Sequence, residues 1–269
     1  MQTIYEIKGQ LKGPTVTIMG GIHGNEFCGV EAIQSLVSDL KIKRGKLNLI
    51  IANPLAIQKD VRAVNVNMNR IFLDEIDSQI KDTYEYQRSL EIRKFLDDSD
   101  ILLDIHSSGP DSQPFVIAEQ NGIKYIQNLN FDLVLTGIDA FHPGSTDGYM
   151  YNKGKVGICI ECGYMRDKNS SNVAIQAVID FLIGLDMLDG EILKSRKSKQ
   201  IFASKLIYKS KTNDFKLVKK FTDFDFVPQG TVIGFDGEKP ISFEKDYYIL
   251  FSVNQSQKNQ ECFLLVNKN

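Results

Sequence analysis

TVTIMGGIHGNE, residues 15–26, joins a β-rich run to a helical one and decides the fold. Thr15 to Gly20 is predicted to form a buried strand, and the apolar residues of Glu26 to Leu40 recur at a helical spacing. Glycines at positions 20, 21 and 24 give the intervening turn the backbone freedom it needs. This order predicts an α/β unit in which polar residues follow the carboxyl end of a strand.

The same alternation continues along the first two-thirds of the chain. Further strands are predicted at Leu47 to Ala52, Ile101 to His106 and Val156 to Cys162, and further helices at Gln79 to Leu96 and Asn172 to Leu188. Such alternation is typical of a mostly parallel sheet with helices on both faces, in which ligands bind beyond the carboxyl ends of the strands. We therefore expect the chemistry at those strand ends.

The C-terminal quarter has a different pattern. From about Glu191 the chain changes to short alternating segments with turns at Pro228-Gln229-Gly230 and Asp236-Gly237. We expect two domains, a catalytic α/β domain at 1–194 and a β domain at 195–269, whose exposed strand edges leave room for a homo-oligomer. The strands predicted in the β domain are Lys199 to Tyr208, Phe215 to Phe221, Gly230 to Phe235, Tyr247 to Val253 and Cys262 to Val266.

The composition excludes several classes of protein. In 269 residues, 32 Lys and Arg oppose 34 Asp and Glu, and the net charge of −2 favours neither a nucleic-acid partner nor a membrane surface. Hydrophobic residues at 42% are enough for a buried core. No run approaches the ~20 apolar residues of a membrane span. We expect neither a secretory leader nor a disulfide framework among the four scattered cysteines, so the sequence predicts a cytoplasmic location.

One stretch is strongly basic. Lys194 to Lys220 contains ten Lys and Arg against one acidic residue, Asp214. A solvated face of the β domain is the simpler interpretation, because charge runs usually have no partner. The alternative is electrostatic attraction of an acidic substrate or an anionic partner.

Two histidines and a glutamate are candidate metal ligands. His23 and Glu26 flank the turn after the first strand and His106 ends another strand, so all three are expected at one edge of the sheet. Two imidazoles and one carboxylate, with a position left for water, are the ligand set of a catalytic zinc site. Asp104, on the same side of its strand as His106, is expected to orient that imidazole. Helix capping by His23, with Glu26 exposed in the first turn, is the simpler alternative.

Glu161 is the candidate general base. It ends an apolar strand, where a carboxylate is costly unless it is hydrogen-bonded or functional. Beside a metal-activated water it would take a proton and return it to the leaving nitrogen. A salt-bridged structural glutamate is the alternative.

Cys159 and Cys162 invite a redox or metal interpretation, which we do not adopt. No second CxxC exists, and a thioredoxin-type CxxC should open a helix. Residues three apart on a strand point to opposite faces, so we predict core packing for one thiol and loop exposure for the other. His142 lies in a predicted loop and is given no role.

An Asn-rich segment from Arg62 to Arg70 follows the strand that ends at Asn53-Pro54. Arginine suits the bidentate capture of a carboxylate and the stabilisation of an oxyanion near a metal. A surface loop with two ordinary cations is the alternative.

Together these residues resemble a known family. GGIHGNE at 20–26, the segment Arg62 to Arg70, Asp104-Ile105-His106 and Ile160-Glu161-Cys162-Gly163 look like the motifs of the succinylglutamate desuccinylase/aspartoacylase family, a branch of the zinc carboxypeptidase superfamily. Their order and approximate spacing agree, and the resemblance covers nearly the whole chain. It implies a three-layer, carboxypeptidase-like α/β fold, a mixed sheet with helices on both faces and a small C-terminal β module.

The resemblance also implies a role for each matched residue. One Zn²⁺ per chain would be held by His23, Glu26 and His106, and Glu161 would be the base that activates water. Arg62 would polarise the scissile carbonyl, while Asn69 and Arg70 would hold a substrate carboxylate. The implied reaction is hydrolysis of a small anionic N-acyl amino acid to a carboxylic acid and a free amino acid.

Two positions depart from the family pattern. Aspartoacylases are expected to have a further arginine shortly before the strand of the catalytic Glu, but Tyr149 to Lys155 contains only lysines as cations. A tyrosine expected in the C-terminal module is replaced by Ser242, ahead of Phe243-Glu244-Lys245. The acyl group and the amino acid are therefore left open.

Two other functions are compatible with parts of this pattern of residues. A zinc carboxypeptidase would use the same metal site, but it needs an open cleft that a β domain folded over the mouth would close. A non-catalytic metal-binding relative would not need Glu161 as a base. A zinc-dependent deacylase is accordingly the function that the sequence favours.

Overall fold

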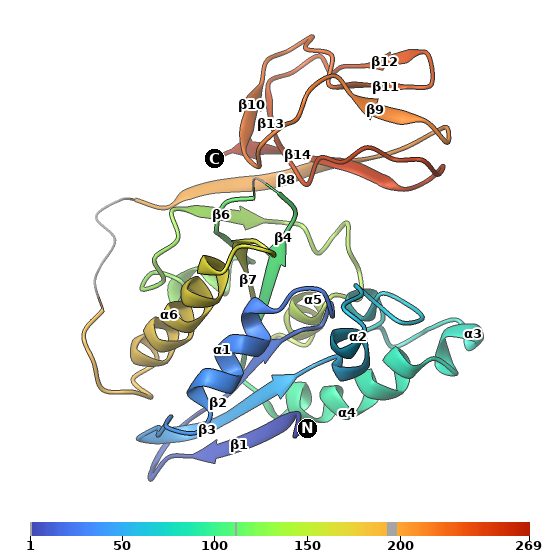
Figure 1. Ribbon diagram of the computed structural model, residues 1–269. Coiled ribbons are helices and arrows are strands. Elements are labelled where there is room, and N and C mark those ends of the chain that lie inside the picture. The colour runs from blue at the N-terminus through green and yellow to red at the C-terminus, as the bar shows by residue number, and fades with distance from the viewer. Residues whose placement is uncertain (1, 111, 193–197) are drawn as a thin grey trace.

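The structure, a computed structural model, describes residues 2–110, 112–192 and 198–269. A large mixed sheet lies between helices on its two faces, and the C-terminal strands gather at one end (Figure 1). This confirms the predicted α/β class. The domain boundary predicted at 194/195 and the first residues of the basic stretch, 194–197, lie outside the described residues.

Eleven strands of the described chain form the main sheet, in the order β1-β3-β2-β4-β7-β5-β6-β8-β14-β13-β10. The strands from β3 to β7 in this order are parallel, and β1, β5 and the pairs beyond β8 introduce antiparallel neighbours. Their bounds are β1 Ile4–Lys8, β2 Leu11–Gly20, β3 Arg44–Ile51, β4 Ile101–Ser108, β5 Phe115–Ala118, β6 Leu133–Thr136, β7 Val156–Tyr164, β8 Gln200–Lys209, β10 Asp225–Val227, β13 Tyr247–Leu250 and β14 Glu261–Lys268.

The helices are distributed over both faces of this sheet (Figure 1). They are α1 Cys28–Leu36, α2 Pro54–Gln58, α3 Ser78–Lys81, α4 Tyr84–Asp98, α5 Thr146–Asn152 and α6 Asn169–Gly184, with short 3-10 helices η1 Met68–Arg70 and η2 Ile123–Tyr125. α1 and α6 pack together on one face, while α4, α5 and η1 cover the other. Within the described ranges, no helix is long and apolar enough to cross a membrane.

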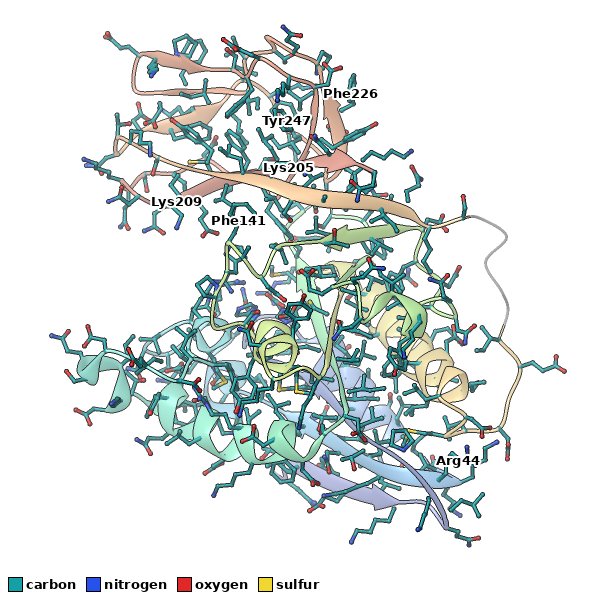
Figure 2. All side chains as sticks on the ribbon, turned by 180° about the vertical axis from the view of Figure 1, so that it is seen from behind. Arg44, Phe141, Lys205, Lys209, Phe226 and Tyr247 are labelled. Atoms are coloured by element: carbon teal, nitrogen blue, oxygen red, sulfur yellow. The ribbon has the colours of Figure 1, made fainter. Side chains whose placement is uncertain are left out.

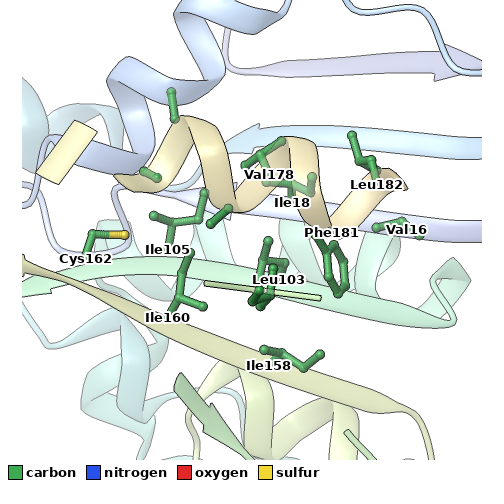
Figure 3. Packing of buried hydrophobic residues seen from close by; sticks show 14 of the residues in the cluster. Val16, Ile18, Leu103, Ile105, Ile158, Ile160, Cys162, Val178, Phe181 and Leu182 are labelled. Atoms are coloured by element: carbon green, nitrogen blue, oxygen red, sulfur yellow. The ribbon is translucent and has the colours of Figure 1, made fainter. Parts of the chain in front are cut away.

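The central strands are buried on both faces, so their residues alternate between two cores. Figure 3 shows Val178, Phe181 and Leu182 of α6 packed over the strand residues Ile18 and Leu103. Residues one position out of phase, such as Met19 and Leu102, belong to the cluster on the opposite face. The polar members of that second face form the site described below.

Two glycines allow α1 to approach the sheet closely. A Cβ on Gly20, at the end of β2, would lie 2.6 Å from the carbonyl carbon of Gly29 in α1. A Cβ on Gly29 would lie 2.8 Å from the Cα of Gly20 and 3.0 Å from the Cβ of Ile105. The turn with His23 and Glu26 lies between these two glycines, so their contact holds it close to the sheet.

The predicted strands of the first two-thirds are confirmed, but the helix bounds need correction. The helix predicted over Gln79 to Leu96 is two helices, because the Asp77 carboxylate caps α3 and the Thr83 hydroxyl accepts from the amide of Tyr86 to start α4. α1 ends at Leu36, four residues before the predicted end, in a turn that closes on the Leu36 carbonyl. α6 covers Asn169–Gly184 rather than Asn172 to Leu188.

Most of the C-terminal strands extend the main sheet, whereas the sequence pattern indicated a separate group of strands. β8 pairs in parallel with β6, and β14, β13 and β10 follow it in order. A separate sheet contains only the short strands β9 Phe215–Leu217, β11 Gly234–Asp236 and β12 Lys239–Ile241 among the described residues. The C-terminal strands are thus hydrogen-bonded to the sheet that carries the candidate site.

We expect Gly29→Ala to destabilise the fold by about 1–3 kcal/mol, because an added methyl group overpacks the contact between α1 and β2. Urea unfolding measures the change. Gly109→Ala is the matched control, since a Cβ there meets no atom within 4 Å. Equal stabilities of the two variants would contradict the close approach described here.

Candidate active site

β4 and β7 place four polar or ionisable side chains side by side. In their parallel register, Asp104 is opposite Cys159 and His106 is opposite Glu161. Because side chains alternate along a strand, all four point to the face away from Leu103 and its core. Each is buried. Desolvated groups of this kind need partners or a function.

The turn after β2 brings His23 and Glu26 to the same place. His23 Nδ1 lies 2.8 Å from Glu26 Oε1, and His106 Nδ1 lies 3.1 Å from Glu26 Oε2. One carboxylate therefore lies between two imidazoles that are 83 positions apart in the sequence. The ligand atoms of the three residues lie within 4.8 Å of one another, an arrangement that could hold a metal ion.

The outer nitrogens of both imidazoles also face acceptors. His23 Nε2 lies 3.1 Å from Asn67 Oδ1, and His106 Nε2 lies 3.2 Å from Asp104 Oδ2. Thr146 Oγ1 in turn donates to Asp104 Oδ2 at 2.5 Å. Such outer partners fix the ring orientation and tautomer of metal-binding histidines. Asp104 thus lies where the sequence predicted an orienting group.

The buried charges have shifted proton affinities. Burial by itself would raise the pKa of Glu26, but the adjacent imidazoles of His23 and His106 hold it well below its usual range. Burial lowers the pKa of His23, which favours the neutral imidazole that can bind a cation. Burial raises the pKa of Glu161 to about 8, and its Oε2 has no hydrogen-bond partner. Glu161 is therefore a carboxyl group with free capacity to exchange a proton.

A second group, His106, Cys159 and Glu161, also satisfies the distances of a metal site but shares His106 with the first. Burial raises the pKa of Cys159 well above its ordinary value, so the thiol keeps its proton and is a poor ligand. The loop exposure predicted for one of the two β7 thiols is wrong, because Cys159 and Cys162 are both buried. They lie on opposite faces, and Cys159 lines the cavity.

These groups open into a cavity of about 590 Å³, which Arg62, Asn69 and Arg70 also line. Arg62 Nη1 donates to Glu26 Oε1 at 3.0 Å. Asn69 Oδ1 accepts from the amide of Thr146 at 3.0 Å, and Arg70 donates to the carbonyl of Asn69 at 2.7 Å. The seven residues to which the family resemblance assigns a role therefore line one cavity, and Arg62 lies beside the histidine and glutamate cluster.

The C-terminal strands and the loops between them supply another wall of the cavity. Its residues there include Phe221, Asp223, Phe251, Gln255 and Glu261. Asp223 accepts hydrogen bonds from Ser112 Oγ and from the amide of Phe251, which ties this wall to the loop after β4.

A further side-chain contact joins the C-terminal strands to the loop before α5. His142, in the loop between β6 and α5, lies 3.0 Å from Glu261 Oε2 at the start of β14. Figure 2 shows Lys209 at the end of β8 and Phe141 in the loop that precedes α5. The Nζ of Lys209 lies 3.6 Å from Glu261 Oε1. His142 and Glu261 thus connect the loop before α5 to the C-terminal strands, a contact that the sequence did not predict.

The two departures from the family pattern have structural consequences. Lys153 forms an ion pair with Asp97, and Lys155 donates to backbone carbonyls of Leu96 and Asp97, so neither lysine lines the cavity. Ser242 is exposed and does not line it either. No side chain at these positions supplies the expected cation or phenol to the cavity.

Sequence reasoning missed several residues around the site. Asn67 belongs to the Asn-rich segment, but only the fold shows which asparagine faces His23. Asp139 and Asp147 line the cavity near α5, a helix that was not predicted from the sequence. The Ser145 cap that starts α5 was the available signal, since its hydroxyl accepts from the amide of Gly148.

A family model described as the succinylglutamate desuccinylase/aspartoacylase catalytic domain matches residues 12–181. This range includes the seven candidate site residues and ends before the C-terminal strands.

Curated relatives match over shorter stretches. The chain is 34% identical over 83 residues to an N-acyl-aromatic-L-amino acid amidohydrolase (carboxylate-forming) of Xenopus laevis, covering 29% of this chain and 27% of that protein. It is 31% identical over 105 residues to an aspartoacylase of Rattus norvegicus, covering 35% of this chain and 34% of that protein. The matched stretch is thus about a third or less of these relatives' length.

A solved structure extends the likeness to the whole fold. A succinylglutamate desuccinylase/aspartoacylase from Rhodobacter sphaeroides superposes with a TM-score of 0.79 at 16% identity, covering 99% of this chain and 88% of the other. The C-terminal strands are therefore part of the shared fold.

We expect the contribution of Glu261 to stability to depend on pH. Its pairing with His142 lowers the pKa of Glu261 to about 2 from 4.5, so the folded state binds fewer protons than the unfolded state. The contribution is therefore complete above about pH 4.5 and is lost as the pH falls toward about 2. Glu261→Gln should lower the free energy of unfolding near pH 5.5 by a few tenths to about 1 kcal/mol, a small amount because the pair is partly exposed. The loss should be smaller near pH 3.

Urea unfolding at the two pH values measures this difference. Glu244→Gln, which changes an exposed glutamate of the same C-terminal region, should have no effect at either pH. If Glu261→Gln lowered the free energy of unfolding by the same amount at both pH values, the pairing with His142 would be ruled out as the source of the loss.

Proposed function

Because this chain belongs to the succinylglutamate desuccinylase/aspartoacylase family, we propose that it is a zinc-dependent deacylase that hydrolyses the amide bond of small N-acyl amino acids. The observation that carries this proposal is the meeting of His23, Glu26 and His106 beside the unpartnered carboxyl oxygen of Glu161 in one cavity. The names of the relatives, an amidohydrolase and an aspartoacylase, support a hydrolase acting on amide bonds.

The donor set fits one Zn²⁺ per chain. Two imidazole nitrogens and one carboxylate, all buried, are the ligands of catalytic zinc sites, and the outer nitrogens of the two rings face Asn67 and Asp104. An ion held by His23, Glu26 and His106 would also compensate the burial of the Glu26 carboxylate. When bound, the zinc supplies a Lewis acid that polarises the acyl carbonyl and acidifies a water.

Glu161 is proposed as the general base. Its buried carboxyl group has a raised pKa and a free oxygen, and an adjacent cation would favour its ionised form. The ionised carboxylate takes a proton from the attacking water. It then delivers that proton to the nitrogen of the breaking amide bond, so that a carboxylate and a free amino group leave.

Arg62, Asn69 and Arg70 are proposed to bind the substrate. The Arg62 guanidinium, which donates to Glu26, would stabilise negative charge that develops on the carbonyl oxygen. Asn69 and Arg70 would hold the carboxylate that makes every N-acyl amino acid anionic. Burial lowers the pKa of Arg70, but an arginine remains charged at neutral pH.

We also propose that residues 195–269 act as a domain that covers the mouth of the site. The support is that C-terminal residues line the cavity and that Glu261 and Asp223 tie this part to the catalytic loops. A covered cavity suits a small substrate better than the chain of a peptide, which disfavours a carboxypeptidase. Four unpaired, buried cysteines support a cytoplasmic setting for the protein.

Purified protein is expected to contain one zinc per chain, and chelation should lower its stability. An ion present at about a hundred to a thousand times its Kd stabilises the folded state by roughly 3–4 kcal/mol, which is lost on removal. Elemental analysis and thermal unfolding with and without chelator measure both quantities.

His106→Ala should lose the metal and its stabilisation. His142→Ala, which removes a cavity histidine outside the proposed ligand set, is the matched control and should retain zinc. Zinc retained by His106→Ala but lost by His142→Ala would refute the proposed ligands.

Glu161→Ala should lose at least about a hundredfold in kcat while it keeps its zinc, because a general base contributes roughly 10²–10⁴-fold. The assay follows amino acid release from a panel of acetyl, formyl and succinyl amino acids. Glu244→Ala, at an exposed position, controls for the substitution itself. Full turnover by a zinc-loaded Glu161→Ala enzyme would reject the mechanism.

A further inference from the structure

Glu85, in the first turn of α4, is a completely buried carboxylate that the proposed hydrolysis does not use. An acid at this place interacts favourably with the helix dipole, which is the simpler reason for its presence. The dipole would attract an exposed carboxylate too, so it does not account for the burial. A buried carboxylate is costly unless hydrogen-bond donors surround it, and these donors show what Glu85 holds.

The donors come from the loop that carries the proposed substrate-binding residues. Glu85 Oε1 accepts from the amide of Val64 at 2.6 Å and from that of Asn65 at 3.3 Å, and Oε2 accepts from the Asn65 amide at 3.2 Å. The Asn65 side chain returns the contact, since its Oδ1 accepts from the amide of Tyr84 at 3.3 Å. Hydrogen bonds in both directions, three of them to a carboxylate, therefore join the loop to the start of α4.

Glu85 supplies the hydrogen bonds that hold the backbone of this loop. Residues 59–67 form neither a helix nor a strand, so no ladder of backbone hydrogen bonds fixes them. Of the amides at positions 62–67, those of Val64 and Asn65 are the two that donate to another group of the described chain. Both donate to the Glu85 carboxylate.

The two amides lie midway between groups of the candidate active site. Arg62, two residues before the first amide, donates to Glu26. Asn67, two residues after the second amide, faces Nε2 of His23 and accepts from the amide of Asn69. A displacement of the backbone at positions 64 and 65 would therefore move polar side chains on both sides of it.

The helix that carries Glu85 is itself fixed to the main sheet. Arg88, one turn further along α4, donates from Nε to the carbonyl of Ala52 at 2.9 Å and from Nη2 to that of Ile51 at 3.0 Å. Ile51 is the last residue of β3, and Ile92 in the next turn of the helix is buried in the core on the same face. Glu85 thus connects the loop to a helix whose distance from the sheet cannot easily change.

We propose that Glu85 is a positioning residue, which holds the loop backbone so that the polar side chains of the loop meet the substrate. Arg62 is then aligned with the acyl carbonyl, and Asn69 and Arg70 with the α-carboxylate. This inference rests on the proposed deacylase function and adds a residue to it. Glu85 is not part of the cavity lining, so it acts on the reaction through the amides that it binds.

Amide hydrogen exchange, followed by NMR, tests the contact without any substrate. In Glu85→Ala the amides of Val64 and Asn65 should exchange at least about tenfold faster than in the wild-type protein, because they lose their acceptor. Glu91→Ala removes an exposed glutamate of the same helix and is the matched control, in which both amides should exchange as in the wild type. Unchanged exchange of both amides in Glu85→Ala would overturn the inference.

Kinetics of the zinc-loaded full chain test the effect on the reaction. With the N-acyl amino acid that the wild-type protein hydrolyses fastest, Glu85→Ala should raise KM and lower kcat/KM by at least about tenfold, since a misplacement of about 1 Å can cost about a hundredfold in rate. KM does not depend on the fraction of the protein that is folded, so a purely structural role would not change it. The zinc content should stay that of the wild type.

Glu85→Gln is the conservative variant. Its amide oxygen can still accept from Val64, but its NH₂ group is a donor and cannot accept from the Asn65 amide. Exchange rates and KM should therefore lie between those of the wild type and those of Glu85→Ala. If Glu85→Ala does not fold, Glu85→Gln decides the matter, and wild-type values of both quantities in that variant would overturn the inference.

The kinetic outcomes distinguish this inference from the function on which it rests. A lower melting temperature of Glu85→Ala with KM unchanged would show that Glu85 serves stability alone, which overturns the inference and leaves the deacylase in place. A zinc-loaded wild-type protein that hydrolyses no N-acyl amino acid would overturn the proposed function and this inference with it.

Discussion

The parallel register between β4 and β7 is the constraint on which the site depends. It sets His106 opposite Glu161 and Asp104 opposite Cys159, all on one face of the sheet. A shift of one residue in either strand would turn its polar side chains into the apolar core of α1 and α6. The apolar residues between them, such as Ile105 and Ile160, fix this register, because they are fully buried on the opposite face.

The turn after β2 and helix α5 bring the other residues of the site to that face of the sheet. The contact of Gly20 with Gly29 draws α1 against the sheet, which brings Glu26 between His23 and His106. On the other side, α5 approaches β7 at Gly157 and supplies Thr146, which contacts both Asp104 and Asn69. Two close backbone approaches therefore determine where the charged groups meet.

Charge is distributed unevenly over the cavity. Arg62 and Arg70 are the cationic groups of its lining named above, while Asp139 and Asp147 are acidic groups of the same lining. The lysines of Tyr149 to Lys155, which point to Asp97 or backbone carbonyls, do not change this balance.

The α/β class, the main strands and the residues that end them could be predicted from the amino-acid sequence, because periodicity, glycines and strand-end polar residues are local signals. His23, Glu26, His106 and Glu161 could be selected in this way. Which of these groups lie together could not be predicted, since the strand register, the two glycine contacts and the pairing of β8 with β6 join residues far apart in the chain. The same holds for the pairing of His142 with Glu261.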